Sequence, residues 1–282
     1  MNGLPERVRL VIFDLDGVIY RGSEPIPGAP GLVDFLHRAG ATVRFATNNS
    51  MATRRQYVER LAALGIRTAE AEIVTSTSAT IDHLRRHAPD VHAVLAVGAD
   101  GMEIELREAG FDVTMAADAS SAEAGAPPTA SHDAVIVGLD PSVDYRRLSA
   151  AMAAVAAGAR LVATNADARY PTPAGVLPGA GAIVAALATA TGVTPEIIGK
   201  PAPAMFTATM ESAGVTARDT VVVGDNADAD VAGAHRAGCA AILVLTGVTD
   251  AAAVGLLDGE RAPDAVAAGP DEVRALLAPR LS

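Results

Sequence analysis

The fold is decided by the stretch Val8-Arg9-Leu10-Val11-Ile12-Phe13-Asp14-Leu15-Asp16-Gly17. Its apolar run has no polar face, which is typical of a parallel strand that is buried on both sides. In open α/β sheets, ligands bind just beyond the carboxyl ends of such strands. Asp14 and Asp16 therefore stand where a site would form, and Gly17 allows the chain to turn away sharply.

Two carboxylates two residues apart have a limited chemistry. Because they repel each other, one of them is protonated or a cation lies between them. Mg²⁺ prefers hard oxygen ligands of this kind. A carboxylate can also act as a nucleophile and form an acyl phosphate. Asp-x-Asp-Gly is equally common at helix N-caps and in turns, so this motif taken alone leaves both interpretations open.

The composition favours a folded protein without membrane contact. The chain has 282 residues, half of them hydrophobic, which is enough for one large domain or two. No apolar run approaches the roughly 20 residues of a membrane span, and residues 1–7 lack the features of a signal peptide. Cys239 is the only cysteine, so an intramolecular disulfide is excluded. We therefore expect a cytoplasmic location.

The charged residues argue against nucleic acid as a partner. The formal net charge is −11, and no long basic run provides the positive footprint that nucleic acid requires. Of the 22 basic residues, 21 are arginine and only Lys200 is lysine. A single lysine in such a chain indicates a site that needs the compact ammonium of lysine rather than the planar guanidinium of arginine. The alternative is that the lysine occurs there by chance.

Strand-like and helix-like stretches alternate along the rest of the chain. We predict strands over residues 8–13, 41–46, 72–75, 92–97, 134–138, 161–164, 220–223, 241–245 and 265–267. Helices are predicted from residue 30, over 53–64, 76–87, 101–109 and 145–157, and around Met205. Stretches rich in glycine, proline, alanine or serine predict a loop or small flap over 18–28 and a loop over 116–131, and the prolines and glycines of 167–181 indicate a boundary. This alternation predicts an α/β fold with a doubly wound, Rossmann-like parallel sheet.

Four polar stretches follow predicted strands or begin loops. They are Asp14 with Asp16, Thr47 with Asn48, Lys200, and Asp225 with Asp228 and Asp230. In a doubly wound sheet such positions converge on one edge, although each alone is also typical of a helix start. Together they suit magnesium-assisted phosphoryl transfer, because a cation and the ammonium would neutralise a phosphate that carboxylates repel. Thr47 and the N–H groups after it would hold phosphate oxygens.

The same stretches resemble the four signature motifs of the haloacid dehalogenase superfamily of phosphatases. The motifs are Phe13-Asp14-Leu15-Asp16-Gly17-Val18, Thr47-Asn48-Asn49-Ser50, Gly199-Lys200-Pro201, and Gly224-Asp225 through Asp230. Their form and spacing are similar to the NagD/p-nitrophenyl phosphatase branch, which includes phosphoglycolate, pyridoxal-phosphate and glycerol-3-phosphate phosphatases. The resemblance covers nearly the whole chain.

The resemblance implies a role for each acidic residue of these motifs. Asp14 would be the nucleophile that takes the phosphoryl group and a metal ligand. Asp16 would protonate the leaving alcohol and later activate water, while its main-chain carbonyl touches Mg²⁺. Asp225 would be the third metal ligand, and Asp230 would support the waters of the metal. The sequence leaves open whether Asp228 or Asp230 lies nearer to the metal.

The resemblance also implies which groups bind the phosphate. Thr47, Asn48 and Asn49 would hold its oxygens, and Lys200 would bridge the phosphate and Asp14. The loop 165–171 is similar to the substrate-specificity loop of the branch, so Arg169 or Tyr170 could meet the leaving group. Packing within the loop is the alternative for these two residues.

The resemblance divides the chain into two domains. Residues 1–85 and 176–282 would form the catalytic core, and residues 86–175 an inserted α/β cap of the C2 type. Such a cap would close over the site and exclude water. Branch members are often dimers, so the resemblance also allows a homodimer.

The expected function is a Mg²⁺-dependent phosphatase of small phosphorylated metabolites that works through phospho-Asp14. Glycerol 3-phosphate is the first substrate choice, on branch resemblance alone. Phosphoglycolate, pyridoxal 5′-phosphate and nucleoside monophosphates stay open. A phosphomutase is a second enzymatic interpretation, and a non-catalytic regulator that binds sugar phosphates is the alternative from another class.

Overall fold

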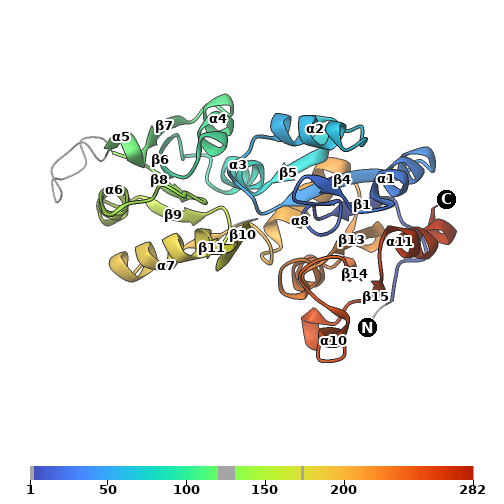
Figure 1. Cartoon of the computed structure of the whole chain (residues 1–282). Coiled ribbons are helices and arrows are strands. Elements are labelled where there is room, and N and C mark those ends of the chain that lie inside the picture. Colours follow the sequence, from blue (N-terminus) through green and yellow to red (C-terminus); the bar gives the residue numbers. More distant parts are fainter. Residues whose placement is uncertain (1–2, 120–130, 173–174, 282) are drawn as a thin grey trace. The chain divides into compact units, whose positions relative to one another are not determined.

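The protein is described from a computed structural model that covers residues 3–119, 131–172 and 175–281 (Figure 1). The chain divides into two compact units. The first unit consists of Met1–Thr47, Arg54–Val74 and Lys200–Ser282, and the second of Asn48–Thr53 and Thr75–Gly199. Each unit has its own parallel sheet, which confirms the predicted α/β class.

The first unit contains a six-stranded sheet in the order β15-β14-β13-β1-β4-β5. The strands are β1 (Leu10–Phe13), β4 (Thr42–Thr47), β5 (Ile73–Thr75), β13 (Thr220–Gly224), β14 (Ala240–Val244) and β15 (Ala265–Ala267). All four residues of β1 are 0% exposed, as its uninterrupted apolar sequence predicts. The strand order runs in opposite directions on the two sides of β1. The boundary between β1 and β13 is therefore the switch point at which such sheets bind ligands.

Helices and a small hairpin complete the first unit. The helices are α1 (Ala29–Arg38), α2 (Arg54–Ala63), α8 (Ala204–Ala213), α9 (Ala232–Arg236), α10 (Ala251–Val254) and α11 (Pro270–Leu277). In α1 the buried side chains Leu32, Val33 and Leu36 recur at helical spacing, which forms the face that packs inward. The predicted loop or flap at 18–28 contains a hairpin of β2 (Tyr20–Arg21) and β3 (Glu24–Pro25).

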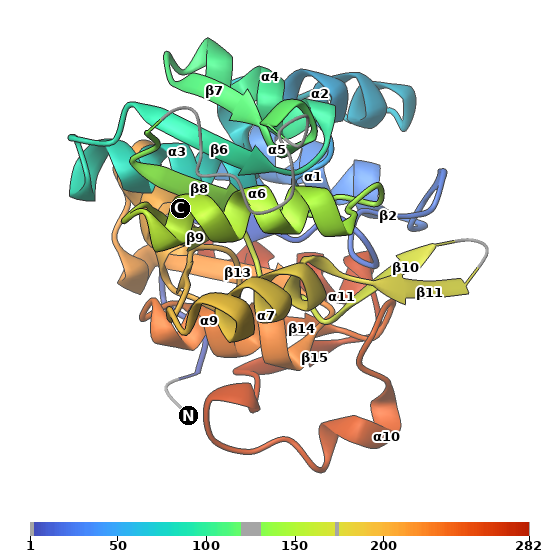
Figure 2. The ribbon, with the colours of Figure 1, turned by 90° about the vertical axis from the view of Figure 1, so that its left-hand side faces the viewer.

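The second unit contains a five-stranded sheet in the order β12-β9-β8-β6-β7. Its strands are β6 (Ala93–Val97), β7 (Asp112–Met115), β8 (Ala134–Val137), β9 (Arg160–Ala163) and β12 (Glu196–Ile197), and every neighbouring pair is parallel. Its helices are α3 (Ser76–His87), α4 (Asp100–Glu108), α5 (Ala116–Ala119), α6 (Tyr145–Ala156) and α7 (Ala180–Thr191). Figure 2 shows α6 and α7 side by side over β8 and β9, where Val137, Leu161 and Leu187 share one apolar core.

Two stretches that were predicted as a loop and as a boundary contain regular structure. The stretch 116–131 begins with α5, because its first four residues hold no glycine or proline, and residues 120–130 lie outside the described residues. The stretch 167–181 contains an antiparallel hairpin of β10 (Arg169–Thr172) and β11 (Gly175–Pro178). Its prolines and glycines indicated a boundary. Pro171 and Pro178 are tolerated in this hairpin because each strand has only one partner and needs no hydrogen bond on its outer edge.

The second unit extends beyond the expected cap, residues 86–175, on both sides. It includes α3 and α7, because α3 packs on α4 and α7 packs on α6. It also includes the short segment Asn48–Thr53. A Cβ atom on Gly101 would lie 2.2 Å from the main-chain oxygen of Met51, so this segment fits closely against the start of α4.

Candidate active site

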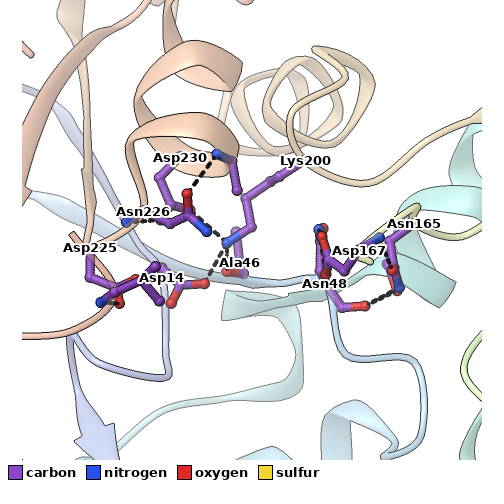
Figure 3. A network of polar contacts seen from close by, with 12 residues as sticks. Asp14, Ala46, Asn48, Asn165, Asp167, Lys200, Asp225, Asn226 and Asp230 are labelled. Carbon is purple, nitrogen blue, oxygen red and sulfur yellow. Dashed lines mark hydrogen bonds and ion pairs between the residues drawn. The ribbon is translucent and has the colours of Figure 1, made fainter. Parts of the chain in front are cut away.

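Asp14 and Lys200 form the centre of a buried polar cluster in the first unit (Figure 3). Asp14 directly follows β1, and its N–H donates to the main-chain oxygen of Val223 on β13 at 2.9 Å. The ammonium of Lys200 donates to Oδ1 of Asp14, to Oδ1 of Asp230 at 2.8 Å and to the main-chain oxygen of Ala46 at 3.2 Å. These three acceptors match the three protons of one ammonium group.

Three carboxylates gather at the switch point of the sheet. Asp14, Asp225 and Asp230 each offer one oxygen, and these oxygens all lie within 4.8 Å of one another. Asp225 is 4% exposed and Asp230 is 2% exposed. A cluster of hard oxygen donors in so little water suits a divalent cation.

Glycines make room for this cluster. A Cβ atom on Gly17 would lie 2.5 Å from Oδ2 of Asp225, and one on Gly247 would lie 1.7 Å from the same atom. The main chain can approach the carboxylate only because both positions lack a side chain. The same oxygen accepts a hydrogen bond from the N–H of Val248 at 2.6 Å, which fixes its orientation.

The charges of the cluster shift its pKa values strongly. Burial raises the pKa of Asp14 well above its usual value; Lys200 opposes this shift, and Asp230 and Asp225 add to it. Burial, with the charge of Asp230, raises the pKa of Asp225 to about 7. Burial alone would lower the pKa of Lys200, but the carboxylates of Asp14 and Asp230 raise it above its usual value. The cluster therefore has an excess of negative charge that a cation would relieve.

The turn after β13 decides which aspartate joins the cluster. Residues Ala227–Val231 form a π-helical turn, a local widening that is frequent at functional sites. Asp230 faces inward on this turn, and its Oδ2 accepts from the N–H of Asn226 at 3.1 Å. The side chain of Asp228 is 79% exposed and lies 3.7 Å from Arg261. Of the two aspartates left open by the sequence, Asp230 is thus the one in the carboxylate cluster.

Asp16 and Thr47 belong to the same unit but not to the carboxylate cluster. Asp16 starts the turn that leads into the β2–β3 hairpin and forms a bridge with Tyr20. Burial by the surrounding protein raises the pKa of Asp16, and the charge of Arg60 opposes this shift. Thr47 is the last residue of β4 and is 4% exposed. Both residues therefore follow or end strands at the expected edge of the sheet.

The other predicted phosphate or substrate residues lie in the second unit. Asn48 donates its side-chain amide to both carboxylate oxygens of Asp167, at 3.1 Å each. The side-chain oxygen of Asn49 accepts from the N–H of Met51 at 2.8 Å. Arg169 and Tyr170 belong to β10. Their roles at a bound phosphate or leaving group stay predictions.

Asp167 is a polar residue of this region that the sequence reasoning did not select. It follows β9 in the short stretch Asn165-Ala166-Asp167, so its position after a strand was the available signal. Asn165 donates to the main-chain oxygen of Asn48 at 2.7 Å, and Ser76 donates to the same oxygen at 2.7 Å. Asn48 is thus held by two other segments of the second unit, the stretch Asn165-Ala166-Asp167 and the start of α3.

Two stretches of the chain match described protein families. Residues 11–112 match the haloacid dehalogenase-like hydrolases, and residues 197–272 match a family described as HAD-hydrolase-like. An acid sugar phosphatase of Staphylococcus aureus (strain USA300) is 33% identical over 244 residues, which are 86% of this chain and 89% of that protein.

Solved structures of phosphatases are similar to nearly the whole chain. The p-nitrophenyl phosphatase from Archaeoglobus fulgidus is 32% identical with a TM-score of 0.84, covering 95% of this chain and 99% of that chain. The glycerol phosphate phosphatase from Mycobacterium tuberculosis in complex with magnesium is 31% identical with a TM-score of 0.83. The match covers 96% of this chain and 78% of that chain.

The chain belongs to the haloacid dehalogenase superfamily, as its four motifs predict. It is an enzyme of the phosphoric monoester hydrolase class, and its structural neighbours include p-nitrophenyl and glycerol phosphate phosphatases. In the described part of the chain, no helix combines the length and apolar composition that crossing a membrane requires.

Proposed function

We propose that this enzyme hydrolyses small phosphomonoesters with Mg²⁺ through a phosphorylated Asp14. The observation that carries the proposal is the contact of Asp14 with Lys200 beside Asp225 and Asp230. This arrangement joins a nucleophile, a fixed positive charge and a set of oxygen ligands at one strand end. Mg²⁺ bound by these carboxylates would neutralise phosphate charge and polarise the phosphorus–oxygen bonds.

The first chemical step would be attack of Asp14 on the phosphorus atom. A carboxylate oxygen forms a bond to phosphorus while the bond to the leaving oxygen breaks. Lys200 is suited to hold both the nucleophile and the transferring phosphoryl group, because its ammonium already contacts Asp14 and is 3% exposed. Thr47, with the N–H groups of Asn48 and Asn49, would bind the remaining phosphate oxygens.

Asp16 would serve as the acid and then as the base. In the first step its proton would pass to the leaving alkoxide, which is too basic to depart without one. In the second step its carboxylate would take a proton from water as the water oxygen attacks the phospho-aspartate. The position of Asp16 two residues after Asp14, on a turn rather than in the carboxylate cluster, supports this separate role.

Glycerol 3-phosphate is the proposed substrate. The support is the 31% identity to the glycerol phosphate phosphatase of M. tuberculosis, whose magnesium complex also supports the choice of metal. We also propose that the second unit acts as the C2-type cap and that Arg169 or Tyr170 contacts the leaving alcohol. We also propose a cytoplasmic location, which the single, buried cysteine Cys239 supports because it leaves no intramolecular disulfide.

The test is a panel of phosphomonoesters assayed for free phosphate with Mg²⁺ and after chelation. The panel would contain glycerol 3-phosphate, phosphoglycolate, pyridoxal 5′-phosphate, nucleoside monophosphates and sugar phosphates, ranked by kcat/KM. We expect Mg²⁺-dependent release with glycerol 3-phosphate ranked first. Another ester ranked first would reject the substrate but keep the mechanism. Binding of the esters without hydrolysis of any would reject the mechanism.

A further inference from the structure

A basic side chain of α2 lies against the hairpin that follows Asp16. The guanidinium carbon of Arg60 is 3.9 Å from the centre of the Tyr20 ring. Its Nη2 atom donates to the main-chain oxygen of Gly22 at 2.7 Å. Gly22 is the turn between β2 and β3 and has a φ of +59°, which favours glycine. One guanidinium therefore contacts both the ring and the turn of the hairpin.

The hairpin is joined to Asp16 by a tight set of main-chain hydrogen bonds. The N–H of Gly17 donates to the oxygen of Tyr20 at 2.7 Å, and the N–H of Ile19 donates to the oxygen of Leu15 at 2.9 Å. Asp16 and Tyr20 also form a bridge. Because these bonds enclose Asp16 on both sides along the chain, a displacement of Tyr20 would displace Asp16 with it.

Arg60 is placed to prevent that displacement. Tyr57 lies one turn earlier on the same face of α2 and is 1% exposed, so this face is anchored in the first unit. Tyr20 is 0% exposed, which gives the guanidinium a fixed ring to stack on. The steps proposed for Asp14, Asp16 and Lys200 give Arg60 no role of its own.

We propose that Arg60 is a positioning residue that holds Asp16 where it can give its proton to the leaving alcohol. The inference rests on the proposed function, because it assumes that Asp16 is the acid. Arg60 acts through its contacts with the ring and the turn of the hairpin, and it makes no contact with the phosphoryl group in this role. Its removal would therefore affect proton donation more than phosphate binding.

The test compares two esters of similar shape that differ in their need for an acid. The leaving group of p-nitrophenyl phosphate departs without a proton, whereas that of phenyl phosphate is much more basic. For each, kcat/KM covers the steps through release of the phenol. We expect Arg60→Ala to lose about tenfold in kcat/KM on phenyl phosphate, a fraction of the full effect of a general acid, and less than about threefold on p-nitrophenyl phosphate.

Three further variants make the comparison decisive. Asp16→Asn should show the same selective loss, but larger. Arg60→Met keeps the apolar stem and serves if Arg60→Ala folds poorly. Arg60→Lys should recover part of the loss, because an ammonium can still contact the Tyr20 ring or the Gly22 oxygen but lacks the planar guanidinium that contacts both. Arg55→Ala is the matched control, because Arg55 lies on the same helix in an exposed pair with Glu70 at 3.3 Å.

The outcomes separate this inference from the proposed function. Equal losses on both esters in a folded Arg60 variant, or no loss on either, would reject the positioning role while leaving the phosphatase mechanism intact. A selective loss in Arg55→Ala would reject it as well. If the wild-type enzyme with Mg²⁺ hydrolyses neither ester, the proposed function itself fails.

Discussion

The ammonium of Lys200 lies 2.8 Å from Oδ1 of Asp230, and the two side chains are 3% and 2% exposed. The same ammonium contacts Asp14, so one buried cation joins the proposed nucleophile to an aspartate of the carboxylate cluster. A buried charge of this kind is expensive unless every one of its hydrogen bonds is made. The main-chain oxygen of Ala46, at 3.2 Å, accepts a third hydrogen bond from this ammonium.

Lys200→Arg is expected to lose most of the activity although it keeps the charge. The three acceptors surround a single point, and a planar guanidinium cannot direct its donors to all of them in the same space. We expect a loss of kcat on the order of 100-fold, comparable to removal of one stabilising donor at an active site. Steady-state kinetics on p-nitrophenyl phosphate will measure it. Near-normal kinetics would show that a compact ammonium is not needed.

Asp14→Asn is expected to abolish phosphate release while the fold stays intact. An amide is a poor nucleophile, but it is similar in size and can still accept a hydrogen bond from Lys200. Phosphate release and incorporation of labelled phosphate into acid-quenched protein should both vanish, and the circular dichroism spectrum should not change. Turnover at a substantial fraction of the wild-type rate in the folded variant would mean that another group is the nucleophile.

The metal-free protein is expected to lose stability as the pH rises from 5 to 8. Burial and Asp230 raise the pKa of Asp225 to about 7, whereas an aspartate in an unfolded chain titrates near pH ~3.9. Between these values the folded state holds a proton that the unfolded state has released. The stability that protonated Asp225 contributes is therefore fully present below its pKa in the unfolded chain. It is lost as the pH rises through its pKa in the folded protein.

Thermal melts in a chelator across this pH range will measure the effect. Mg²⁺ should raise the Tm most at pH 8, because the bound cation replaces the proton in relieving carboxylate repulsion. The control is Asp225→Asn, which carries no titrating group at this position and should show a flatter pH profile and a smaller response to Mg²⁺. Identical profiles for the two proteins would exclude Asp225 as the titrating group and as a ligand.

Much of the first unit could be predicted from the sequence, because β1, β13 and β14 are apolar over almost their whole length. The strand before Asp14 and the one before Asp225 were both predicted from their apolar residues, and both are buried along their whole length. Their carboxyl ends meet as expected. The choice between Asp228 and Asp230 could not be predicted. It depends on a π-helical turn, whose hydrogen bonds have no residue pattern that distinguishes them from an ordinary helix start.

The second unit was harder to predict because its defining contacts join residues far apart in the sequence. Every residue of β11 is exposed, so it lacks the burial alternation from which a strand is predicted. The pair of Asn48 and Asp167 joins two residues that are 119 positions apart. Nothing near Asn48 indicates this partner, and the N-cap interpretation fits the local sequence equally well.

Removal of the Asp167 carboxylate is expected to destabilise the second unit. In Asp167→Ala the amide of Asn48, a residue that is 8% exposed, loses the two acceptors at 3.1 Å. Loss of a partner for a largely buried donor typically costs about 1–3 kcal/mol. A double-mutant cycle with Asn48→Ala should give a coupling energy of about 0.5–3 kcal/mol in the free energy of unfolding.

The exposed Asp228 provides the control for this cycle. Its side chain is 79% exposed, so Asp228→Ala should change the free energy of unfolding by less than about 0.5 kcal/mol and should not couple to Asn48. Hydrogen exchange adds a local measurement, because loss of the pair should speed exchange in residues 48–53 and 165–168 before the rest of the unit. Additive effects of Asp167→Ala and Asn48→Ala, with unchanged exchange in both segments, would mean that the pair contributes nothing to the stability of the unit.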